Sequence, residues 1–396
     1  MKTEIYTLNQ LGTVSRGKSK HRPRNDAILY GGKYPFIQTG DIKHSSMYIT
    51  EYSQTYNETG LAQSKLWDED TLCITIAANI AETAILKIKA CFPDSIVGFI
   101  ANKEKADVRF VKYYFDIYKL YMQNISKGTT QDNFSLEKML RVKFNIPSLS
   151  IQQKIANILS RYDEAIENNN KRIKLLEQMA QNLYKEWFVR FRFPGWQNVE
   201  FENGIPKGWK VVRLRDIAKD VGKSITKNEI NYANDVYIPI DCIPNHQMAL
   251  TEVSDIENAE SSLQRFEKND IIFGAMRVYF HKVILAPMNG VTRTTCFVIN
   301  SKNKIMHNYL YSLLFSESTI SYANTISVGA TMPYVRWNDF IRMYCLLPPN
   351  EIVEKYNNIV EPIFKKILGS YEYNQNLAKQ RDLLLPRLMS GKLEVE

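Results

Sequence analysis

One six-residue stretch of this chain recurs in nearly the same form. The number of residues between its two copies also separates other matching residues along much of the sequence. Ile125-Ser126-Lys127-Gly128-Thr129-Thr130 returns as Ile326-Ser327-Val328-Gly329-Ala330-Thr331, 201 residues later. A constant offset indicates two copies of one unit, each about half of the 396 residues. Two copies are too few for a solenoid. They suit a molecule of two lobes with approximate two-fold symmetry, and therefore a target with two parts. The same offset pairs further identical residues: Ile37 with Ile238, Ile42 with Ile243, Arg141 with Arg342, Pro147 with Pro348, Ile151 with Ile352, Lys154 with Lys355, Asn157 with Asn358 and Ile158 with Ile359.

Length and composition predict a folded protein of two to three domains. The hydrophobic content of 44% and aromatic content of 12% are those of a globular chain, and each half is long enough to bury its own core. The formal net charge is +9. This basic excess suits a polyanionic partner such as nucleic acid, and it suits a solvated basic surface equally well.

The five cysteines predict free thiols in a reducing cytoplasm. Cys73, Cys91, Cys242, Cys296 and Cys345 are scattered, and none forms a Cys-x-x-Cys pair, so neither a disulfide framework nor a zinc site is indicated. The first residues lack the apolar core of a secretory signal, and no apolar run is long enough to span a bilayer. We therefore expect a cytoplasmic protein with no membrane partner.

Each copy has the pattern of a mixed α/β module followed by a long helix. Strands are bounded by turn residues, and a helix in each module has apolar side chains at helical spacing. In the first module we expect strands at Tyr34–Gln38, Leu72–Ile76, Ala84–Ile88 and Arg141–Ile146, a helix over Ala106–Met122 and a polar loop at Ser126–Asn133. In the second we expect strands near Val236–Ile240, Ile271–Ala275, Val283–Ala286, Thr295–Ile299 and Arg342–Leu347, a helix near Ile305–Tyr322 and a loop at Ser327–Tyr334.

The two long helices give the clearest local pattern. No Pro or Gly interrupts Ile151–Phe193, and at 1.5 Å per residue this helix is a rod of roughly 60 Å. Its apolar stripe needs a partner in water, and the second copy supplies one. The expected packing residues of the first helix are Ile151, Ile155, Ile158, Tyr162, Ile166, Ile173, Leu176 and Leu183. Those of the second helix are Ile352, Ile359, Ile363, Ile367, Leu377 and Leu384.

Connectivity predicts that the two rods pack antiparallel, with one module at each end. Asn169 and Asn374 lie on the stripes. Such polar residues either fix the register at some cost in stability or face solvent at the edge of the seam, and the sequence leaves both alternatives open. Pro362 lies inside the second rod, where we expect it to kink or restart the helix.

Motifs for catalysis are missing. The sequence contains neither a phosphate-binding Gly-x-x-x-x-Gly-Lys-Ser/Thr loop nor a Gly-x-Gly-x-x-Gly fingerprint. Gly17-Lys18-Ser19 and Gly222-Lys223-Ser224 resemble the end of the first motif but lack its upstream glycine. The histidines suggest no ligand cluster, and Cys242 with His246 is interpreted as structural. We expect no catalytic residue and no metal site.

Three polar stretches have the character of segments that read DNA, because base readout needs donors and acceptors on loops flanked by cations. Each stretch alone is more typical of a solvated loop, but two recur at equivalent places in both copies. The candidates in the first module are Arg16, Lys18, Lys20, Arg22, Lys127, Thr129, Thr130 and Gln131. Those in the second are Arg277, Tyr279, His281, Lys282, Thr331, Tyr334 and Arg336.

Four motifs together resemble the specificity subunits of type I restriction–modification systems, over essentially the whole chain. One is the Gly-x-Thr loop of both copies, and another is the stretch 146–159, Ile-Pro-Ser-Leu-Ser-Ile-Gln-Gln-Lys-Ile-Ala-Asn-Ile-Leu, which opens the first long helix. The others are Ile205-Pro206-Lys207-Gly208-Trp209-Lys210 before the second module and the C-terminal stretch 383–393, Leu-Leu-Leu-Pro-Arg-Leu-Met-Ser-Gly-Lys-Leu.

The resemblance implies an α+β fold with pseudo-two-fold symmetry, in which two similar target-recognition domains are joined by two long antiparallel helices. The expected boundaries are 1–147 and 195–348 for the domains, with spacer helices at 148–194 and 349–396. Each domain would read half of an interrupted, asymmetric sequence in double-stranded DNA. Half-sites about one helical turn apart, ~10 bp, suit such a ruler.

The resemblance also implies partners that do the chemistry in phage defence. Two methyltransferase subunits would bind S-adenosylmethionine, and restriction subunits would add ATP- and Mg-dependent translocation and endonuclease cleavage. This chain would bind no cofactor. Two other hypotheses remain: an orphan or decoy subunit that docks methyltransferases without productive DNA recognition, and a standalone DNA-modifying enzyme with an unrecognised site.

Overall fold

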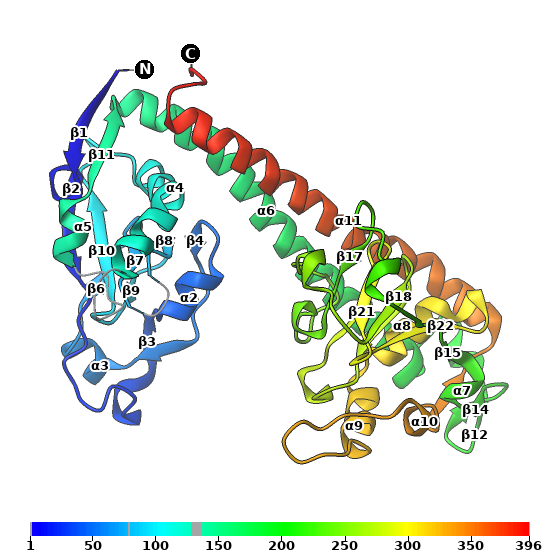
Figure 1. Ribbon diagram of the computed structural model, residues 1–396. Coiled ribbons are helices and arrows are strands. Elements are labelled where there is room, and N and C mark those ends of the chain that lie inside the picture. Colours follow the sequence, from blue (N-terminus) through cyan, green and yellow to red (C-terminus); the bar gives the residue numbers. More distant parts are fainter. Residues whose placement is uncertain (1, 78–79, 128–135, 396) are drawn as a thin grey trace. The chain divides into compact units, whose positions relative to one another are not determined.

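The computed structural model describes residues 2–77, 80–127 and 136–395, without the side chains of 120–127. The chain forms two compact units, one of Met1–Asn168 with Asn376–Glu396 and the other of Asn169–Gln375. Two long helices, α6 (Leu149–Tyr184) and α11 (Asn350–Met389), contribute residues to both units. Figure 1 traces the elements in each unit.

The first unit contains two small sheets and a strand pair. The strand pair joins β1 (Thr3–Thr7) to β11 (Lys143–Pro147). A five-stranded sheet has the order β2 (Gly12–Arg16), β10 (Ile96–Ala101), β7 (Leu72–Thr75), β8 (Thr83–Leu86) and β4 (Tyr48–Ile49). A four-stranded sheet has the order β5 (Gln54–Tyr56), β3 (Tyr30–Phe36), β9 (Ala90–Cys91) and β6 (Leu66–Trp67). The helices are α1 (Leu8–Leu11), α2 (Thr39–His44), α3 (Glu58–Ala62), α4 (Val108–Lys127) and α5 (Leu136–Arg141).

The second unit has a similar arrangement, with four strands in each of its two main sheets. Its strand pair joins β14 (Lys210–Arg213) to β23 (Tyr344–Leu347). One sheet has the order β15 (Ala218–Asp220), β22 (Cys296–Ser301), β19 (Ile271–Gly274) and β20 (Val283–Leu285). The other has the order β16 (Lys223–Ile225), β18 (Leu263–Phe266), β21 (Gly290–Arg293) and β17 (Val236–Tyr237), and a hairpin joins β12 (Phe201–Glu202) to β13 (Ile205–Pro206). The helices are α7 (Leu214–Ile217), α8 (His307–Leu314), α9 (Glu317–Thr325) and α10 (Trp337–Phe340).

The internal repeat of the sequence is therefore a repeat of structure. The backbone N–H of Ile37 donates to the Cys91 carbonyl at 2.8 Å, and the N–H of Ile238 donates to the Val291 carbonyl at 3.0 Å. In both units this bond continues a parallel pairing inside a largely antiparallel fold. Ile37 and its counterpart Ile238 are completely buried. The prediction of two similar mixed α/β domains is confirmed.

The helix expected near the centre of the first module is α4, which runs through Lys127. Its buried Val111 and Phe115 pack on the five-stranded sheet, as their spacing predicts. The expected loop at Ser126–Asn133 is wrong at its beginning, because Ser126 and Lys127 still belong to the helix. In the second module the expected helix at Ile305–Tyr322 is two helices. The first, α8, ends at Leu314, and Ser316 caps α9 by accepting a hydrogen bond from the Thr319 N–H at 3.4 Å.

In the first unit, α6 and α11 enclose an ion pair. The Asp163 carboxylate is 2% exposed, and it accepts hydrogen bonds from the Tyr113 hydroxyl of α4 and the Arg381 guanidinium of α11. Burial and the nearby carboxylate raise the pKa of the Tyr113 hydroxyl, so it stays a donor. This group joins the module's own helix to both long helices at one point.

In the second unit the seam carries paired amides. The Asn169 side chain is 8% exposed and donates to Oδ1 of Asn374 at 2.8 Å, and Asn374 donates to Oδ1 of Asn170 at 2.7 Å. The structure therefore excludes the alternative in which Asn169 faces solvent. An apolar neighbour would leave the amide unpaired, so the contact favours one register.

The predicted packing residues Ile155, Ile173, Ile363 and Ile367 are buried. Ile359 is a wrong prediction, because it is 46% exposed. The next residue, Val360, is fully buried instead, since the stripe of α11 is rotated slightly from the one drawn through Ile359. The other predicted packing residues are half-buried: Ile151, Ile158, Tyr162, Ile166, Leu176, Leu183, Ile352, Leu377 and Leu384.

The ends and continuity of the rods also differ from expectation. The first helix ends at Tyr184 and is followed by a π-helical turn at Lys185–Val189, which keeps Trp187 and Phe188 buried. The prediction that the second helix restarts at Pro362 is wrong, since α11 is continuous from Asn350 to Met389. Pro362 and Asn358 are both exposed, so water can satisfy the carbonyl that loses its N–H partner.

Gln152 fastens the beginning of α6 to the first module. Its side chain is 1% exposed; Oε1 accepts the Asp107 N–H at 3.0 Å, and Nε2 donates to the carbonyls of Lys105 and Pro147, each at 2.9 Å. The adjacent Gln153 is exposed. The two neighbours in this motif thus differ completely in environment.

We predict that Arg381→Met destabilises the first unit by about 3 kcal/mol, because it leaves the buried Asp163 charge with only the Tyr113 hydroxyl as partner. The measurement is the free energy of unfolding in urea. Combining Arg381→Met with Asp163→Asn should recover part of the loss, since the unpaired charge is then gone. Additive losses in the double variant would contradict a direct coupling.

We predict that Gln152→Ala lowers the free energy of unfolding by about 2 kcal/mol, because three backbone groups lose their partner. The matched control is Gln153→Ala, for which we expect a change within about 0.5 kcal/mol. Equal losses in the two variants would show that Gln152 is not a fastening point.

Candidate nucleic-acid interface

The basic segment of the first unit, residues 16–24, begins at the end of β2. Backbone hydrogen bonds hold its first residues in place, and its charged side chains are exposed. The Gly17 N–H donates to the Ile96 carbonyl at 2.8 Å, and the Lys18 N–H donates to the Phe92 carbonyl at 3.0 Å. Arg16, Lys18 and Lys20 are exposed. In the part of the chain that the structure describes, their side-chain cations have no acidic partner.

A glycine is required where this segment begins. A Cβ added at Gly17 would lie 2.3 Å from the Pro93 carbonyl oxygen and 2.4 Å from that of Phe92. Both contacts are to backbone, so no side-chain movement can relieve them. Gly17 therefore fixes the path along which Lys18 and Lys20 are presented.

The second half of the segment is anchored by side chains. The Gln63 amide oxygen accepts the N–H groups of Lys20 and His21, at 2.6 and 3.0 Å. The Arg22 guanidinium donates to the carbonyls of Ser19 and His21, at 2.7 and 2.8 Å. Arg22 was predicted to contact DNA, and in this structure it also holds the shape of its own loop. Its exposed side chain lies 4.0 Å from an Asp94 carboxylate oxygen.

In the second unit the structure brings two predicted stretches together. The turn after β19 packs against residues 333–335: the Arg277 N–H donates to the Pro333 carbonyl at 2.7 Å, and the Val335 N–H donates to the Ala275 carbonyl at 2.8 Å. Arg277 adopts a left-handed backbone with φ 48°. Residues 277–282 and 331–336 thus form one surface beside α9.

Four of the predicted residues are exposed on this surface. They are Tyr279, Thr331, Tyr334 and Arg336. The Arg336 guanidinium lies over the Tyr334 ring, 5.9 Å from its centroid. An aromatic face beside a cation suits the stacking and phosphate contacts that nucleic acid offers.

His281 and Lys282 do not fit the predicted role. His281 is 2% exposed, because it points into the protein between its turn and α9. The Lys282 ammonium donates to the Ile240 carbonyl at 2.7 Å and is half-buried. Arg277 is also half-buried. The alternation of polar and aromatic residues in this stretch hid the fact that its turn directs some side chains inward.

The remaining candidates of the first module lie beyond what the structure describes. Thr129, Thr130 and Gln131 fall outside the described residues, and of Lys127 only the backbone, at the end of α4, is described. Their part in DNA contact stays a prediction.

Sequence reasoning missed cations in the second unit. Lys219 of β15 and Lys223 at the beginning of β16 are exposed on either side of Gly222. Gly222-Lys223-Ser224 follows β15 as Gly17-Lys18-Ser19 follows β2, but one residue farther from the end of the strand. The duplicated tripeptide is visible in the sequence, but its likeness to a phosphate-binding loop drew attention away from its repetition.

The prediction that the histidines form no ligand cluster is also wrong. His246, His281 and Glu317 place their ligand atoms within 4.8 Å of one another. Thirty-five residues or more separate each from the next along the chain, so spacing in the sequence gave no indication of this meeting.

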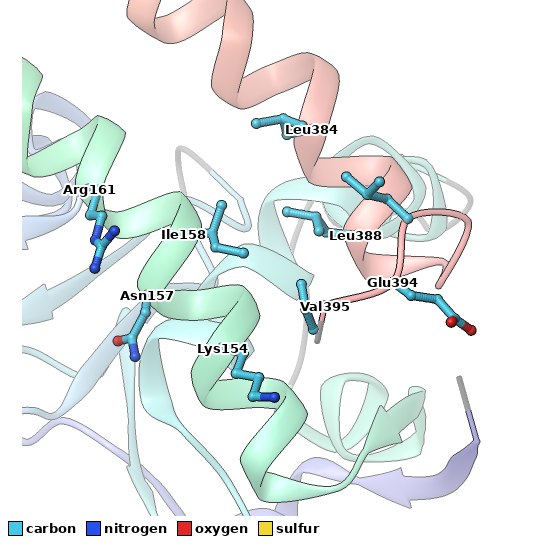
Figure 2. A pocket seen from close by; sticks show the side chains of 9 residues that line it. Lys154, Asn157, Ile158, Arg161, Leu384, Leu388, Glu394 and Val395 are labelled. Carbon is cyan, nitrogen blue, oxygen red and sulfur yellow. The ribbon is translucent and has the colours of Figure 1, made fainter.

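A groove of about 460 Å³ lies between α6, α11 and the C-terminal segment of the first unit (Figure 2). Apolar side chains from α11 and the C-terminal segment, including Leu384, Leu388 and Val395, face Ile158 of α6. Lys154 and Arg161 belong to the same lining. This mixture suits a protein partner better than a small metabolite.

Comparison with known proteins identifies the family. Residues 2–178 and 206–373 match the type I restriction modification DNA specificity domain. The chain belongs to this family. It is 28% identical to the type I restriction enzyme MjaIX specificity subunit of Methanocaldococcus jannaschii, over 99% of this chain and 94% of that protein. It is 23% identical to the HindI specificity subunit of Haemophilus influenzae, over 97% of this chain and 98% of that protein.

A crystal structure shows the same fold for this specificity-domain family. The S subunit of a type I restriction–modification system from M. genitalium superimposes with a TM-score of 0.63, at 15% identity, over 98% of this chain and 96% of that one. None of the helices among the described residues is long and apolar enough to cross a membrane.

Helix α6 also positions the surface of the second unit. The buried Glu177 carboxylate of α6 accepts the N–H groups of Met248 and Ala249, both at 2.8 Å. Burial raises the pKa of Glu177, and the two N–H donors partly offset that rise. The His246 N–H, just before this loop, donates to the His281 carbonyl at 3.0 Å. One carboxylate therefore links the long helix to the loop beside the candidate surface.

We predict that Glu177 contributes stability that is lost as the pH rises from about 5 towards 8. Its folded pKa lies above the ordinary value of 4.5, so the folded state holds the proton more tightly and loses that advantage as the pH rises through the folded pKa. Glu177→Gln should reduce the fall, measured as urea midpoints at both pH values. Glu164→Gln, exposed on the same helix, should leave it unchanged. The prediction fails if both variants keep the wild-type dependence.

Proposed function

We propose that this chain is the DNA-recognition subunit of a type I restriction–modification complex, and that its two modules read the two halves of an interrupted, asymmetric target. The observation that carries the proposal is the duplicated Gly-Lys-Ser tripeptide. In each unit it follows an edge strand of a sheet and exposes a lysine, Lys18 or Lys223.

Electrostatics supports this role. The net charge of +9 favours a polyanion, and exposed cations near the turns, such as Arg16 and Lys219, suit phosphate contacts that position a module on DNA. The second unit adds an exposed tyrosine and arginine pair, Tyr334 and Arg336. Two linked readers gain affinity without new contacts, because the second binding event is intramolecular.

Different exposed side chains give the two modules different specificities. The first presents a mainly basic segment at Arg16–Lys20, whereas the second combines the aromatic Tyr279 and Tyr334 with cations. Surfaces that differ this much recognise different sequences. We therefore propose half-sites that are not related by symmetry, in double-stranded DNA.

The long helices are proposed to dock methyltransferase subunits, and through them restriction subunits. Exposed apolar side chains on the helices are costly in water and suit a protein interface. Leu175 and Met179, four residues apart on α6, are 61% and 56% exposed, and Leu383 on α11 is 57% exposed. The groove at Leu384 and Leu388 in the first unit lies on the same helices (Figure 2).

Catalysis is proposed to reside in those partners, which would hold S-adenosylmethionine, ATP and Mg. Proteins similar to this chain are named as specificity subunits of restriction enzymes. We expect the complex to work in the cytoplasm, where its DNA is.

The test is co-expression with the methyltransferase subunit encoded beside it, in a host without adenine methylation, followed by genome-wide mapping of methylated adenine. A single gapped, asymmetric motif is the expected result. A complex that forms but leaves the genome unmethylated would favour a decoy subunit. Methyl transfer or cleavage by the purified chain alone would favour a standalone enzyme.

We predict that Lys18→Gln and Lys223→Gln each weaken DNA binding by a similar factor for all sequences and reduce the slope of log affinity against log salt by about one. The measurement is fluorescence anisotropy of the methyltransferase complex with duplex DNA at several salt concentrations. Lys103→Gln, an exposed lysine in a different turn, is the matched control. Slopes equal to wild type in both turn variants would place the phosphate contacts elsewhere.

A further inference from the structure

Three side chains with metal-binding atoms meet in the second unit. They are His246, in the loop after strand β17; His281, at the end of the turn between β19 and β20; and Glu317, the first residue of α9. One imidazole nitrogen from each histidine and one carboxylate oxygen lie within 4.8 Å of one another. Nitrogen and oxygen donors in this combination are those that zinc and similar divalent ions prefer.

Backbone structure holds each of the three donors in place. His246 and His281 both have left-handed backbones, with φ of 55° and 53°. The His246 N–H donates to the His281 carbonyl at 3.0 Å, so the two loops are tied together. Non-glycine residues in this region are uncommon and are often found where a side chain must be aimed. The histidine rings lie with centroids 4.9 Å apart.

The His281 ring has one satisfied nitrogen and one unsatisfied nitrogen. Nε2 lies 2.8 Å from the Phe315 carbonyl oxygen and must donate its proton there. Nδ1 is buried and has no hydrogen-bond partner among the described residues. In the neutral ring that donates from Nε2, Nδ1 carries the lone pair.

That lone pair faces a carboxylate. Oε1 of Glu317 lies 3.4 Å from Nδ1 of His281. Two electron-rich atoms at this distance repel each other unless a proton or a metal ion lies between them. In a tetrahedral zinc site with ligand bonds near 2.0 Å, neighbouring donor atoms lie about 3.3 Å apart. The observed separation already matches a pair of zinc ligands.

The surroundings also match a metal site. A metal-binding histidine usually donates its other ring N–H to a carbonyl or carboxylate, which fixes the tautomer, and the Phe315 carbonyl fills this role for His281. Ser316 holds the beginning of α9, next to Glu317, by accepting the Thr319 N–H. His246 and Glu317 are exposed on the solvent side, which leaves room for water as a fourth ligand.

We propose that His246, His281 and Glu317 bind one divalent transition-metal ion, zinc by preference, with Nδ1 of His281 as the buried ligand. The ion fastens together the loop at 246–249, the turn at 277–282 and the beginning of α9. Since that turn carries Arg277 and Tyr279, the ion rigidifies a segment of the candidate DNA surface. The proposed role of the ion is structural. This proposal replaces the expectation from the sequence that the chain has no metal site.

The test uses the full chain, stripped with a chelator and titrated with Zn²⁺ alone in competition with a chromogenic chelator. We expect one tight site per chain. His246→Asn keeps a residue that tolerates the left-handed backbone, and Glu317→Gln keeps the helix position, so neither change should unfold the protein. Each should weaken the site on the order of tenfold or more. His44→Asn, an exposed histidine in the first unit, should bind as wild type.

Two further readouts separate this site from adventitious binding. Co²⁺ in place of Zn²⁺ should give a visible absorption band of a low-coordinate site in wild type and His44→Asn but not in His246→Asn. Saturating Zn²⁺ should raise the melting temperature of wild type, because it binds only the folded state. Absence of a tight site in wild type, or equal affinity in wild type, His246→Asn and Glu317→Gln, overturns the proposal.

Discussion

Burial of the apolar stripes of α6 and α11 is the constraint on which the rest of each unit depends. A helix of this length is not stable alone in water, and most of its stability must come from packing one face against a partner. In the first unit Ile155 and Leu159 of α6 share a core with Leu388 of α11 and with the sheet. In the second, Tyr356 of α11 packs against Trp187 and Phe188, which follow α6. In each unit the apolar side chains of the long helices therefore belong to the same core as those of the module.

Apolar packing alone permits a helix to slide or rotate, and polar groups within the seams remove that freedom. Asp163 with Arg381 and Asn169 with Asn374 are buried or half-buried pairs. A shifted register leaves each of them without a partner, which costs more than the pair gains. Gln152 and Glu177 have a different role, because they attach α6 to loops of the modules. The rods thereby set positions in the modules as well as their own alignment.

Periodicity and repetition predicted much of the fold, because both follow from local geometry. The stripes of α6 and α11, the strands at Leu72–Thr75 and Ile271–Gly274, and the duplication itself were all accessible from the sequence. The exact rotation of a stripe was not accessible, so Ile359 was placed inside although the next residue, Val360, occupies the core. The break between α8 and α9 was missed although its capping bond joins Ser316 to Thr319, three residues away, because serine before a helix is a start signal that the apolar pattern outweighed.

The candidate site was harder to predict, since it depends on contacts distant in sequence. Composition located the basic segment at Arg16–Lys20, and its exposure agrees with the expectation. It could not show that the turn after Arg277 directs His281 inward, where it meets His246 and Glu317. Composition also gave Arg22 the same weight as Lys18, although the carbonyls of Ser19 and His21 occupy the Arg22 guanidinium.

The glycine at the beginning of the basic segment has a consequence for how such a protein diverges. A side chain at Gly17 would collide with two backbone carbonyls, so the path of that segment is inherited unchanged while its neighbours are free to vary. At Gly222 the nearest obstacle is the amide end of Gln264, a buried side chain that donates to the carbonyls of Arg293 and Cys296. Selection for a new target therefore meets a frame fixed by backbone in the first module. In the second module the frame can change only together with Gln264.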